Sequence, residues 1–231
     1  MSITCVTGYW NITNKHGNKF EAWFENTLRI NNPYVIFSDK EGIEALKQYR
    51  MGLPTYYIEM DINDFYMQKY KDKIAVNSQH CPSVELNMIW NEKIFLLQKA
   101  YKTNPFNSEF FHWIDAGICT YRKRKPPSCE FSQEKIKSLP VDKFIYSSSD
   151  RYDETRVTAT SYYHHVSGTT YILHKTIIDD FVDLYKSYVE KLMDKGNIWT
   201  DQLILTHIYK DHKELFYMLC TGYGNIVLRL F

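Results

Sequence analysis

Short apolar runs alternate along this chain with longer segments that carry one apolar face, a pattern typical of proteins that mix strands and helices. The apolar runs predict strands at residues 2–7, 34–37, 55–60, 110–114, 143–149, 170–173 and 214–219. Apolar residues at helical spacing predict helices at residues 19–30, 41–49, 84–101, 174–193 and 200–210. Because the first sixty residues run strand, helix, strand, helix, strand, we expect a parallel sheet with helices on its faces.

The predicted helix at 84–101 carries a lysine, Lys93, in the middle of its apolar stripe. The stripe itself consists of Leu86, Ile89, Trp90, Leu96, Leu97, Ala100 and Tyr101. A buried ammonium needs a partner, and an anionic ligand would serve. Alternatively, the aliphatic stem covers the stripe while the ammonium stays in water. The pattern leaves both interpretations open.

Small and polar residues directly follow three of the predicted strands. In an open α/β sheet ligands bind beyond the carboxyl ends of the strands, so we expect these residues to share one site. They are Thr7, Gly8 and Tyr9, then Ser38 and Asp39, and then Asp115, Ala116 and Gly117.

Asp115 is the most distinctive of these candidates because this single carboxylate directly follows the apolar run FFHWI. A carboxylate there suits a hard divalent cation that bridges to phosphate. The small residues Ala116 and Gly117 would let a diphosphate approach the backbone closely. The alternative is that Asp115 caps a turn and Gly117 supplies a positive φ angle.

Asp201 and Gln202 open the last predicted helix, where Thr200 is the expected cap and Trp199 is expected to pack on Ile204. The helix dipole favours an acidic residue in a first turn. The same carboxylate would equally point into a cleft as a catalytic or acceptor-binding group.

Two adjacent histidines, His164 and His165, precede Ser167 and Gly168 and are candidates to bind sugar hydroxyls or a metal. Adjacent residues of a strand point to opposite faces, so at most one of the two histidines faces a site.

Composition narrows the functional classes. The formal net charge is +1, so no global field directs the chain to nucleic acid or to a membrane. The 19 Tyr, 13 Phe and 5 Trp suit ligands such as sugars and bases, although codon usage in an AT-rich genome explains them equally well. The basic run 122–125 is interpreted as part of a solvated loop over 122–140, with phosphate or nucleic-acid binding as the alternative.

Cysteine usage and the N-terminal sequence predict a cytoplasmic protein. The five cysteines include no C-x-x-C pair, which argues against a structural zinc or a disulfide framework and favours a reducing compartment. The N-terminus has no basic segment leading into an apolar run, and no stretch of 18 apolar residues follows, so we expect neither a signal peptide nor a membrane span.

The block from Trp90 to Ile118, which includes "KAYKTNPFNSEFFHWIDAGI", resembles the HtrL/YibB-like family of glycosyltransferase-like proteins. "TCVTGYWNI", "NPYVIFSD", "SGTTYIL" and "WTDQLILTHI" fit the same family, so the resemblance covers most of the chain. It implies a GT-A-like, Rossmann-related fold with a mixed, mainly parallel sheet flanked by helices. The implied domain is single, with a nucleotide-binding half at 1–120 and an acceptor-side half at 121–231.

The resemblance implies transfer of a sugar from a nucleotide-sugar, with a UDP-sugar expected, to a glycan or protein-linked acceptor. Its implied donor-binding residues are Thr7, Gly8, Tyr9, Asp39, Lys93, Trp113, Asp115, Ala116 and Gly117. Its implied sugar- or acceptor-binding residues are His165, Ser167, Gly168, Thr169 and Gln202.

Asp201 is the implied catalytic carboxylate nearest the anomeric carbon. It would act as base in an inverting reaction, or as stabiliser or nucleophile in a retaining one. "YYHHVSGTT" followed by "WTDQ" is similar to a segment of blood-group-type retaining transferases. "DQ" at the start of a late helix is similar to glycogenin-like enzymes. By this analogy we expect a reaction that retains the anomeric configuration of the sugar.

The cofactor expected from the resemblance is a divalent cation, Mn²⁺ or Mg²⁺, held by Asp115. Set beside the "DxD" motif of such families, however, the chain has Gly117 where the second aspartate stands. The ion would then need a ligand from elsewhere, such as a histidine. This departure also supports an alternative, an inactive protein of the same fold that binds a nucleotide-sugar or glycan. A nucleic-acid-binding protein acting through 122–125 is a further alternative, against which the neutral charge argues.

Overall fold

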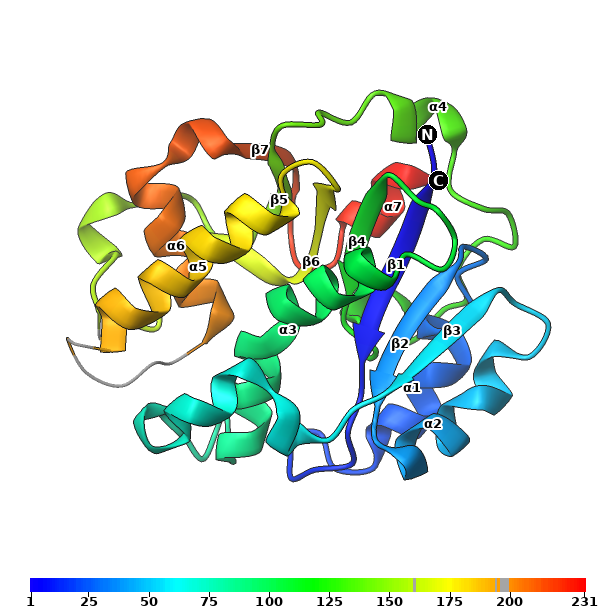
Figure 1. The fold of residues 1–231 in the computed structure, drawn as a ribbon, viewed down its shortest axis with the longest axis horizontal. Coiled ribbons are helices and arrows are strands. Elements are labelled where there is room, and N and C mark those ends of the chain that lie inside the picture. The colour runs from blue at the N-terminus through cyan, green and yellow to red at the C-terminus, as the bar shows by residue number, and fades with distance from the viewer. Residues whose placement is uncertain (160, 194, 196–199) are drawn as a thin grey trace.

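A computed structural model describes residues 1–159, 161–193, 195 and 200–231. Seven strands form one sheet in the order β3-β2-β1-β4-β6-β5-β7 (Figure 1). The strands are β1 (Ile3–Gly8), β2 (Tyr34–Ser38), β3 (Thr55–Glu59), β4 (Phe110–Ile114), β5 (Phe144–Ser148), β6 (Val166–His174) and β7 (Phe216–Thr221). The α-helices are α1 (Lys19–Thr27), α2 (Lys40–Lys47), α3 (Val84–Thr103), α4 (Gln133–Lys137), α5 (Ile178–Met193), α6 (Asp201–Asp211) and α7 (Ile226–Leu230).

The sheet is mixed and mainly parallel, as the sequence predicts. β1 pairs in parallel with both β2 and β4, β2 pairs in parallel with β3, and β5 pairs in parallel with β7. β6 runs antiparallel to both of its neighbours, β4 and β5. The reversed strand therefore brings its N-terminal residues to the edge where β1, β2 and β4 end.

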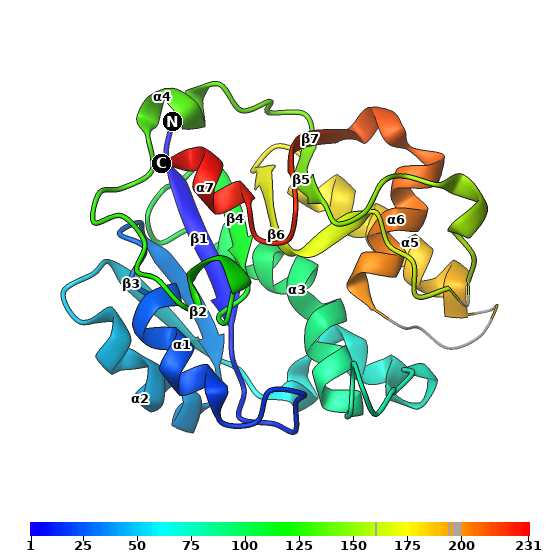
Figure 2. The same cartoon turned by 180° about the vertical axis from the view of Figure 1, so that it is seen from behind.

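Helices cover both faces of the sheet. Successive residues of a strand point to opposite faces, and along β1 the side chain of Val6 joins one core while that of Cys5 joins the other. The first core packs against α3, α5 and α6, and the second against α1, α2, α4 and α7. Figure 2 shows the second set of helices from behind the sheet.

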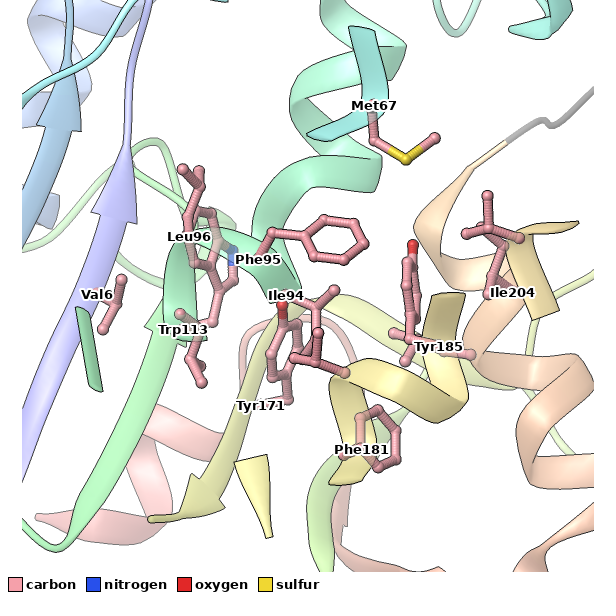
Figure 3. Close-up of a cluster of buried hydrophobic side chains, with 14 of the residues drawn as sticks. Val6, Met67, Ile94, Phe95, Leu96, Trp113, Tyr171, Phe181, Tyr185 and Ile204 are labelled. Atoms are coloured by element: carbon pink, nitrogen blue, oxygen red, sulfur yellow. The ribbon is translucent and has the colours of Figure 1, made fainter. Parts of the chain in front are cut away.

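The first core explains the apolar stripe of α3. In Figure 3, Leu96 of α3 lies beside Trp113 of β4, and Phe95 points toward Tyr185 of α5. All four side chains are buried, and the rings of Phe95 and Tyr185 meet edge to face with centroids 5.8 Å apart. The helix is therefore held between the sheet and α5, so polar residues on its inner faces must find partners inside the protein.

Several predicted elements have different boundaries. β6 begins at Val166 instead of residue 170, because Val166 pairs with Ser148 of β5 and the small residues that follow continue the strand. His174 ends that strand, so α5 begins only at Ile178. The loop predicted over 122–140 contains α4, whose N-cap Ser132 accepts a hydrogen bond from the backbone of Lys135.

Two further predictions concern the last third of the chain. The strand predicted at 214–219 lies at Phe216–Thr221, after a 3₁₀ turn. Thr200 caps α6 as predicted, by accepting a hydrogen bond from the backbone of Leu203, whereas Trp199 and its predicted contact lie outside the described residues. None of the helices described is long and apolar enough to cross a membrane.

Candidate functional site

The carboxyl ends of three parallel strands meet the start of β6 at one edge of the sheet. Val6 of β1 lies opposite Trp113 of β4, so Gly8 and Asp115, two residues further along, end neighbouring strands. Gly8 in turn lies opposite Phe37 of β2. The backbone N–H of Asp115 donates to the carbonyl of Thr169 in β6, 3.0 Å away. The predicted convergence of strand ends is confirmed.

Lys93 lies at the centre of this edge and is almost completely buried, with 4% of its surface exposed. Its Nζ lies 2.9 Å from Oδ1 of Asp115 and 3.4 Å from Oδ2 of Asp201, and it donates to the carbonyl oxygen of Gly168 at 3.0 Å. The prediction that Lys93 is buried with partners is confirmed, although these partners are groups of the protein itself, so an anionic ligand stays a prediction; the alternative with the ammonium in water is wrong. We call Lys93, Asp115 and Asp201 the buried ion cluster.

The two carboxylates offset the cost of burying the Lys93 charge. Burial lowers the pKa of Lys93, but the nearby charges of Asp115 and Asp201 outweigh it, so the pKa lies above its usual value. An ammonium held in this way stays protonated over the whole physiological pH range. Removing either carboxylate weakens this compensation, because a charge out of water depends on its partners.

Asp115 is the more open carboxylate of the pair, with 29% of its side chain exposed against 6% for Asp201. Its Oδ1 also accepts a hydrogen bond from Nε1 of Trp113 at 2.8 Å. Trp113 and Asp115 are two residues apart and so point to the same side of the chain. This tryptophan and Lys93 together fix one carboxylate oxygen of Asp115.

Asp201 is the first residue of α6 and points into the site. Burial raises its pKa to about 6, while the Lys93 charge opposes this shift and that of Asp115 adds to it. Its Oδ2 is buried and contacts the Lys93 ammonium at 3.4 Å, an ion pair rather than a well-formed hydrogen bond. Asp201 thus lies in a helical first turn, where the helix dipole favours it, and beside Lys93, while its role as a catalytic or acceptor-binding group stays a prediction.

Gly168 allows α6 to approach β6 at this point. A Cβ atom on Gly168 would lie 2.2 Å from Oδ2 of Asp201 and 2.9 Å from Cγ of Gln202. The backbone N–H of Gly168 donates to Oε1 of Gln202 at 3.1 Å. The flanking hydroxyls of Ser167 and Thr169 bond to each other at 2.9 Å. Residues 167–169 and Gln202 are thus part of the same constellation as the buried ion cluster.

His165 has a packing role in the structure. Its side chain is buried, Nε2 bonds to the hydroxyl of Tyr146 at 2.8 Å, and Nδ1 bonds to the carbonyl of Asp150 at 2.7 Å. Both ring nitrogens are therefore engaged, which leaves none for a sugar or a metal. Its neighbour His164 contacts the hydroxyl of Tyr223.

Gly117 is enclosed by aromatic rings of α1. A Cβ atom there would lie 2.7 Å from the ring of Phe20 and 2.9 Å from that of Trp23. An aspartate at this position would collide with both rings, so the second acid of a "DxD" motif has no room. The φ angle of Gly117 is not in the left-handed region, so the alternative of a positive-φ turn is wrong. The carbonyl of its neighbour Ala116 accepts a hydrogen bond from Thr27.

Of the predicted residues at the ends of β1 and β2, Asp39 lines a pocket of roughly 230 Å³, and Thr7, Gly8 and Tyr9 do not. Asp39 lines this pocket and caps α2 by accepting a hydrogen bond from the backbone of Gly42 at 2.7 Å. Thr7 is buried, a Cβ atom on Gly8 would meet the Trp10 ring at 2.7 Å, and the Tyr9 ring packs edge to face on Phe24. The pocket is lined by Trp10, Asp39, Asp61, Ile62, Asn63, Gln68, Lys71, Glu85 and Met88.

Most residues of this pocket were missed by the sequence reasoning. Trp10 directly follows the predicted Tyr9, and its Nε1 donates to the carbonyl of Met60 at 2.9 Å. That contact ties the end of β1 to the chain after β3. Most of the remaining lining residues lie in or next to 3₁₀ turns, which have no periodic pattern, and two lie at the start of the predicted helix α3.

A larger hollow, of roughly 560 Å³, lies elsewhere. It is lined by residues of α1, the 3₁₀ turn after α2 and the segment 125–128, and it shares no residue with the buried ion cluster. Catalytic sites need convergent ionisable groups with shifted pKa values. We therefore place the candidate site at the buried ion cluster and the smaller pocket.

The side chains around Asp115 do not fit a resident Mn²⁺ or Mg²⁺. Such ions need several oxygen ligands, yet Oδ1 of Asp115 already contacts Trp113 and the Lys93 ammonium, which repels a cation. Among the residues that the structure describes, no group of three or more His, Cys, Asp or Glu side chains is arranged to hold a metal ion. The predicted cation and its predicted histidine ligand stay predictions.

Known structures share this fold at low sequence identity. Mouse xyloside xylosyltransferase 1, in its apo form, is 11% identical, with a TM-score of 0.56 over 95% of this chain and 85% of that one. The galactosyltransferase LgtC, in complex with donor and acceptor sugar analogues, is 8% identical, with a TM-score of 0.57 over 95% of this chain and 73% of that one. Both are GT-A glycosyltransferases, so the fold of this protein is of the GT-A type.

Sequence comparison identifies the family. The family model described as "Bacterial protein of unknown function (HtrL_YibB)" matches residues 76–231, which include α3, the buried ion cluster and α6. A search of curated proteins finds no match. Because the family model spans well over half of the chain, this protein is a member of the HtrL/YibB family with a GT-A fold.

Proposed function

We propose that this protein is a glycosyltransferase that moves a sugar from a nucleotide-sugar, most simply a UDP-sugar, to a hydroxyl of a glycan or protein-linked acceptor. The observation that carries the proposal is the buried ion cluster at the carboxyl edge of a GT-A sheet. Ionisable groups with shifted pKa values, such as Asp201, cluster at functional sites. The pocket that Asp39 lines, next to that edge, accommodates the nucleoside of the donor.

The proposed reaction exchanges one bond at the anomeric carbon of the donor sugar. The bond from this carbon to the diphosphate oxygen breaks, and its electron pair leaves with the nucleoside diphosphate. The oxygen of the acceptor hydroxyl forms the new bond and releases its proton. Asp115 contacts the donor through its exposed side, while Lys93 holds Asp115 and Asp201 in fixed positions.

Asp201 is the group we place nearest the anomeric carbon. With a pKa raised to about 6, it suits proton transfer near neutral pH, so in an inverting reaction it takes the proton of the acceptor. In a retaining reaction it stabilises the sugar cation or attacks the anomeric carbon, and the leaving diphosphate takes the proton. The likeness of "WTDQ" to retaining enzymes favours the second course. The anomeric configuration of the product, read by NMR, decides between them.

Thermal melting against a panel of nucleoside diphosphates and nucleotide-sugars, with and without Mn²⁺ or Mg²⁺, tests the donor site. A ligand at 100 times its dissociation constant stabilises by about 2.7 kcal/mol. We expect a nucleotide-selective shift that disappears in Asp115→Asn and persists in the control Asp179→Asn. Asp179 is a suitable control because its carboxylate is exposed and pairs with Lys102. No shift with any nucleotide would refute the donor site.

A second candidate is a protein that binds a nucleotide-sugar without transferring it. The near-complete burial of Asp201, 4% exposed, favours this candidate because a reacting sugar has little access to the carboxylate. Prolonged incubation with each nucleotide-sugar that shifts the melting temperature separates the two. Release of free sugar or formation of glycoside, lost in Asp201→Asn, excludes the non-catalytic candidate.

A further inference from the structure

Three cationic side chains surround His16 next to the turn that carries Gly117. Nε of Arg122 donates to the carbonyl of Gly117 at 2.7 Å, and its guanidinium stacks 3.8 Å from the centroid of the Trp23 ring. The His16 ring also packs on Trp23, with centroids 4.9 Å apart. Lys15 and Lys19 flank the same histidine. We call Lys15, Lys19 and Arg122 the basic cluster.

The three cations are close enough to act on one imidazole. Burial, together with the charges of Arg122, Lys15 and Lys19, lowers the pKa of His16 to about 4. In the ion pairs formed by the described residues, none of these three cations has a carboxylate partner. Like charges in close proximity repel one another, so the cluster forms a positive region without an ion-pair partner among the described residues, although the charge of Asp115 reaches Arg122.

The basic cluster lies at the same edge of the sheet as the buried ion cluster. Arg122 is fixed to Gly117, two residues from Asp115, whose charge acts on the guanidinium. Residues 10–18 connect the end of β1 to α1, and the carbonyl of Thr13 accepts a hydrogen bond from the Ser83 side chain at 2.8 Å. Lys15 reaches the start of α3, where its Nζ lies 5.7 Å from the centroid of Trp90.

A bound diphosphate would need positive charge that the buried ion cluster does not supply. Lys93 is neutralised by Asp115 and Asp201, so the buried ion cluster offers no free positive charge to a diphosphate. A second aspartate at position 117 is excluded by Phe20 and Trp23, and the donor set around Asp115 does not fit a metal ion. The basic cluster supplies positive charge at this edge of the sheet, beside the turn that carries Gly117.

We propose that the basic cluster binds the diphosphate of the donor and supplies the positive charge that a divalent ion would otherwise provide. The inference rests on the proposed function, since it assigns the diphosphate of the same donor. Arg122 is best suited to contact the phosphate oxygens, because a guanidinium presents several donors in a planar fork. As the bond to the anomeric carbon breaks, the electron pair passes to a diphosphate oxygen next to these cations.

The experiment uses isothermal titration calorimetry with uridine, guanosine, adenosine and cytidine diphosphates, first in EDTA and then with excess Mg²⁺ or Mn²⁺. We expect the preferred diphosphate to bind in EDTA, with a dissociation constant that changes less than threefold on addition of metal. Arg122→Gln weakens its binding at least tenfold, while binding of the matching nucleoside without phosphates changes less than twofold.

Two further variants control for damage to the fold. Arg124→Gln removes the other arginine of the 122–125 run, which is exposed, and leaves binding unchanged. The double variant of Lys15→Gln and Lys19→Gln removes two exposed side chains and weakens diphosphate binding at least fivefold without lowering the melting temperature.

The possible outcomes separate this inference from the function on which it rests. Binding that occurs only with metal, or equal affinities for Arg122→Gln and Arg124→Gln, overturns the inference and leaves a metal-dependent transferase in place. No binding of any nucleoside diphosphate, with or without metal, overturns both. Metal-independent binding that falls in Arg122→Gln and in the double lysine variant supports the inference.

Discussion

The turn at residues 115–117 connects the buried ion cluster to the basic cluster. The charges of the first cluster are buried and paired, whereas those of the second have no ion-pair partner among the described residues. In the first, Lys93 lies out of water between two carboxylates and a carbonyl oxygen. In the second, the exposed Lys15 and Lys19 lie near Arg122 with no acidic partner among the described ion pairs.

The difference shows which charged side chains can stay unpaired in the absence of a ligand. A charge in the protein interior must be compensated by the protein itself, because desolvation costs several kcal/mol per ion. A charge near the surface is solvated and screened, so it can remain unpaired until a ligand arrives. Loss of a charge should therefore cost stability in the buried ion cluster and ligand affinity in the basic cluster.

Lys93→Met should have the largest effect. It leaves Asp115 and Asp201 without their cation, and breaking a buried pair from one side typically costs 3–5 kcal/mol. We expect a loss of about this size in the free energy of unfolding, measured by urea denaturation. The control Lys102→Met, which breaks the exposed pair with Asp179, should leave the free energy of unfolding almost unchanged, because water screens exposed ion pairs. Equal losses in the two variants would show that Lys93 is not held as described.

Gly168→Ala should have the next largest effect. The new methyl would lie 2.2 Å from Oδ2 of Asp201, so the first turn of α6 must move away from β6. Overpacking of this kind costs about 1–3 kcal/mol of unfolding free energy. The substitution should also weaken the contact between Lys93 and Asp201. A variant as stable as the wild type would mean that α6 does not dock tightly on β6.

The pH dependence of stability should report on Asp201. Its pKa rises from 3.8 to about 6 on folding, chiefly through burial, so between these pH values the folded state binds more protons than the unfolded state. Stability conferred by the protonated form is therefore lost as pH rises through this window. Relative to Asp201→Asn, the wild type should become less stable from pH 4 to pH 6, as measured by urea denaturation at each pH. A constant difference would contradict the raised pKa.

Lys15→Gln should have the smallest effect on stability. The side chain is exposed and has no carboxylate partner in the described ion pairs, so the free energy of unfolding should change by less than about 0.5 kcal/mol. A destabilisation similar to that of Lys93→Met would remove the distinction between the two clusters. Differential scanning calorimetry of both variants makes the comparison.

Local patterns were sufficient for most of the architecture. Strand and helix periodicities placed the core of nearly every large element, because each must bury one face of known period. They failed at the start of β6, where Ser167 and Gly168 lack apolar character but lie within the strand. Short helices such as α4 and α7 were also missed, since five residues contain too few turns for a periodic signal.

The same contrast applies to the candidate site. Lys93, Asp115 and Asp201 were each notable in sequence because a charge interrupted an apolar pattern or opened a helix. The three lie far apart along the chain, and each had a plausible alternative explanation. Their contacts confirm that Lys93 is buried and paired, while the catalytic role of Asp201 stays a prediction.

By itself, the sequence determined the α/β class, the order of the main elements and the family, because these depend on local periodicity and on motifs contiguous in the chain. Only the tertiary structure decided that Lys93 bridges two aspartates 86 residues apart in the chain, numbered 115 and 201. It also decided that the rings of Phe20 and Trp23 exclude a second acid at Gly117 and that Arg122 lies beside this turn. These facts depend on how the helices pack against the sheet, and no local pattern encodes the distance between residues remote in the chain.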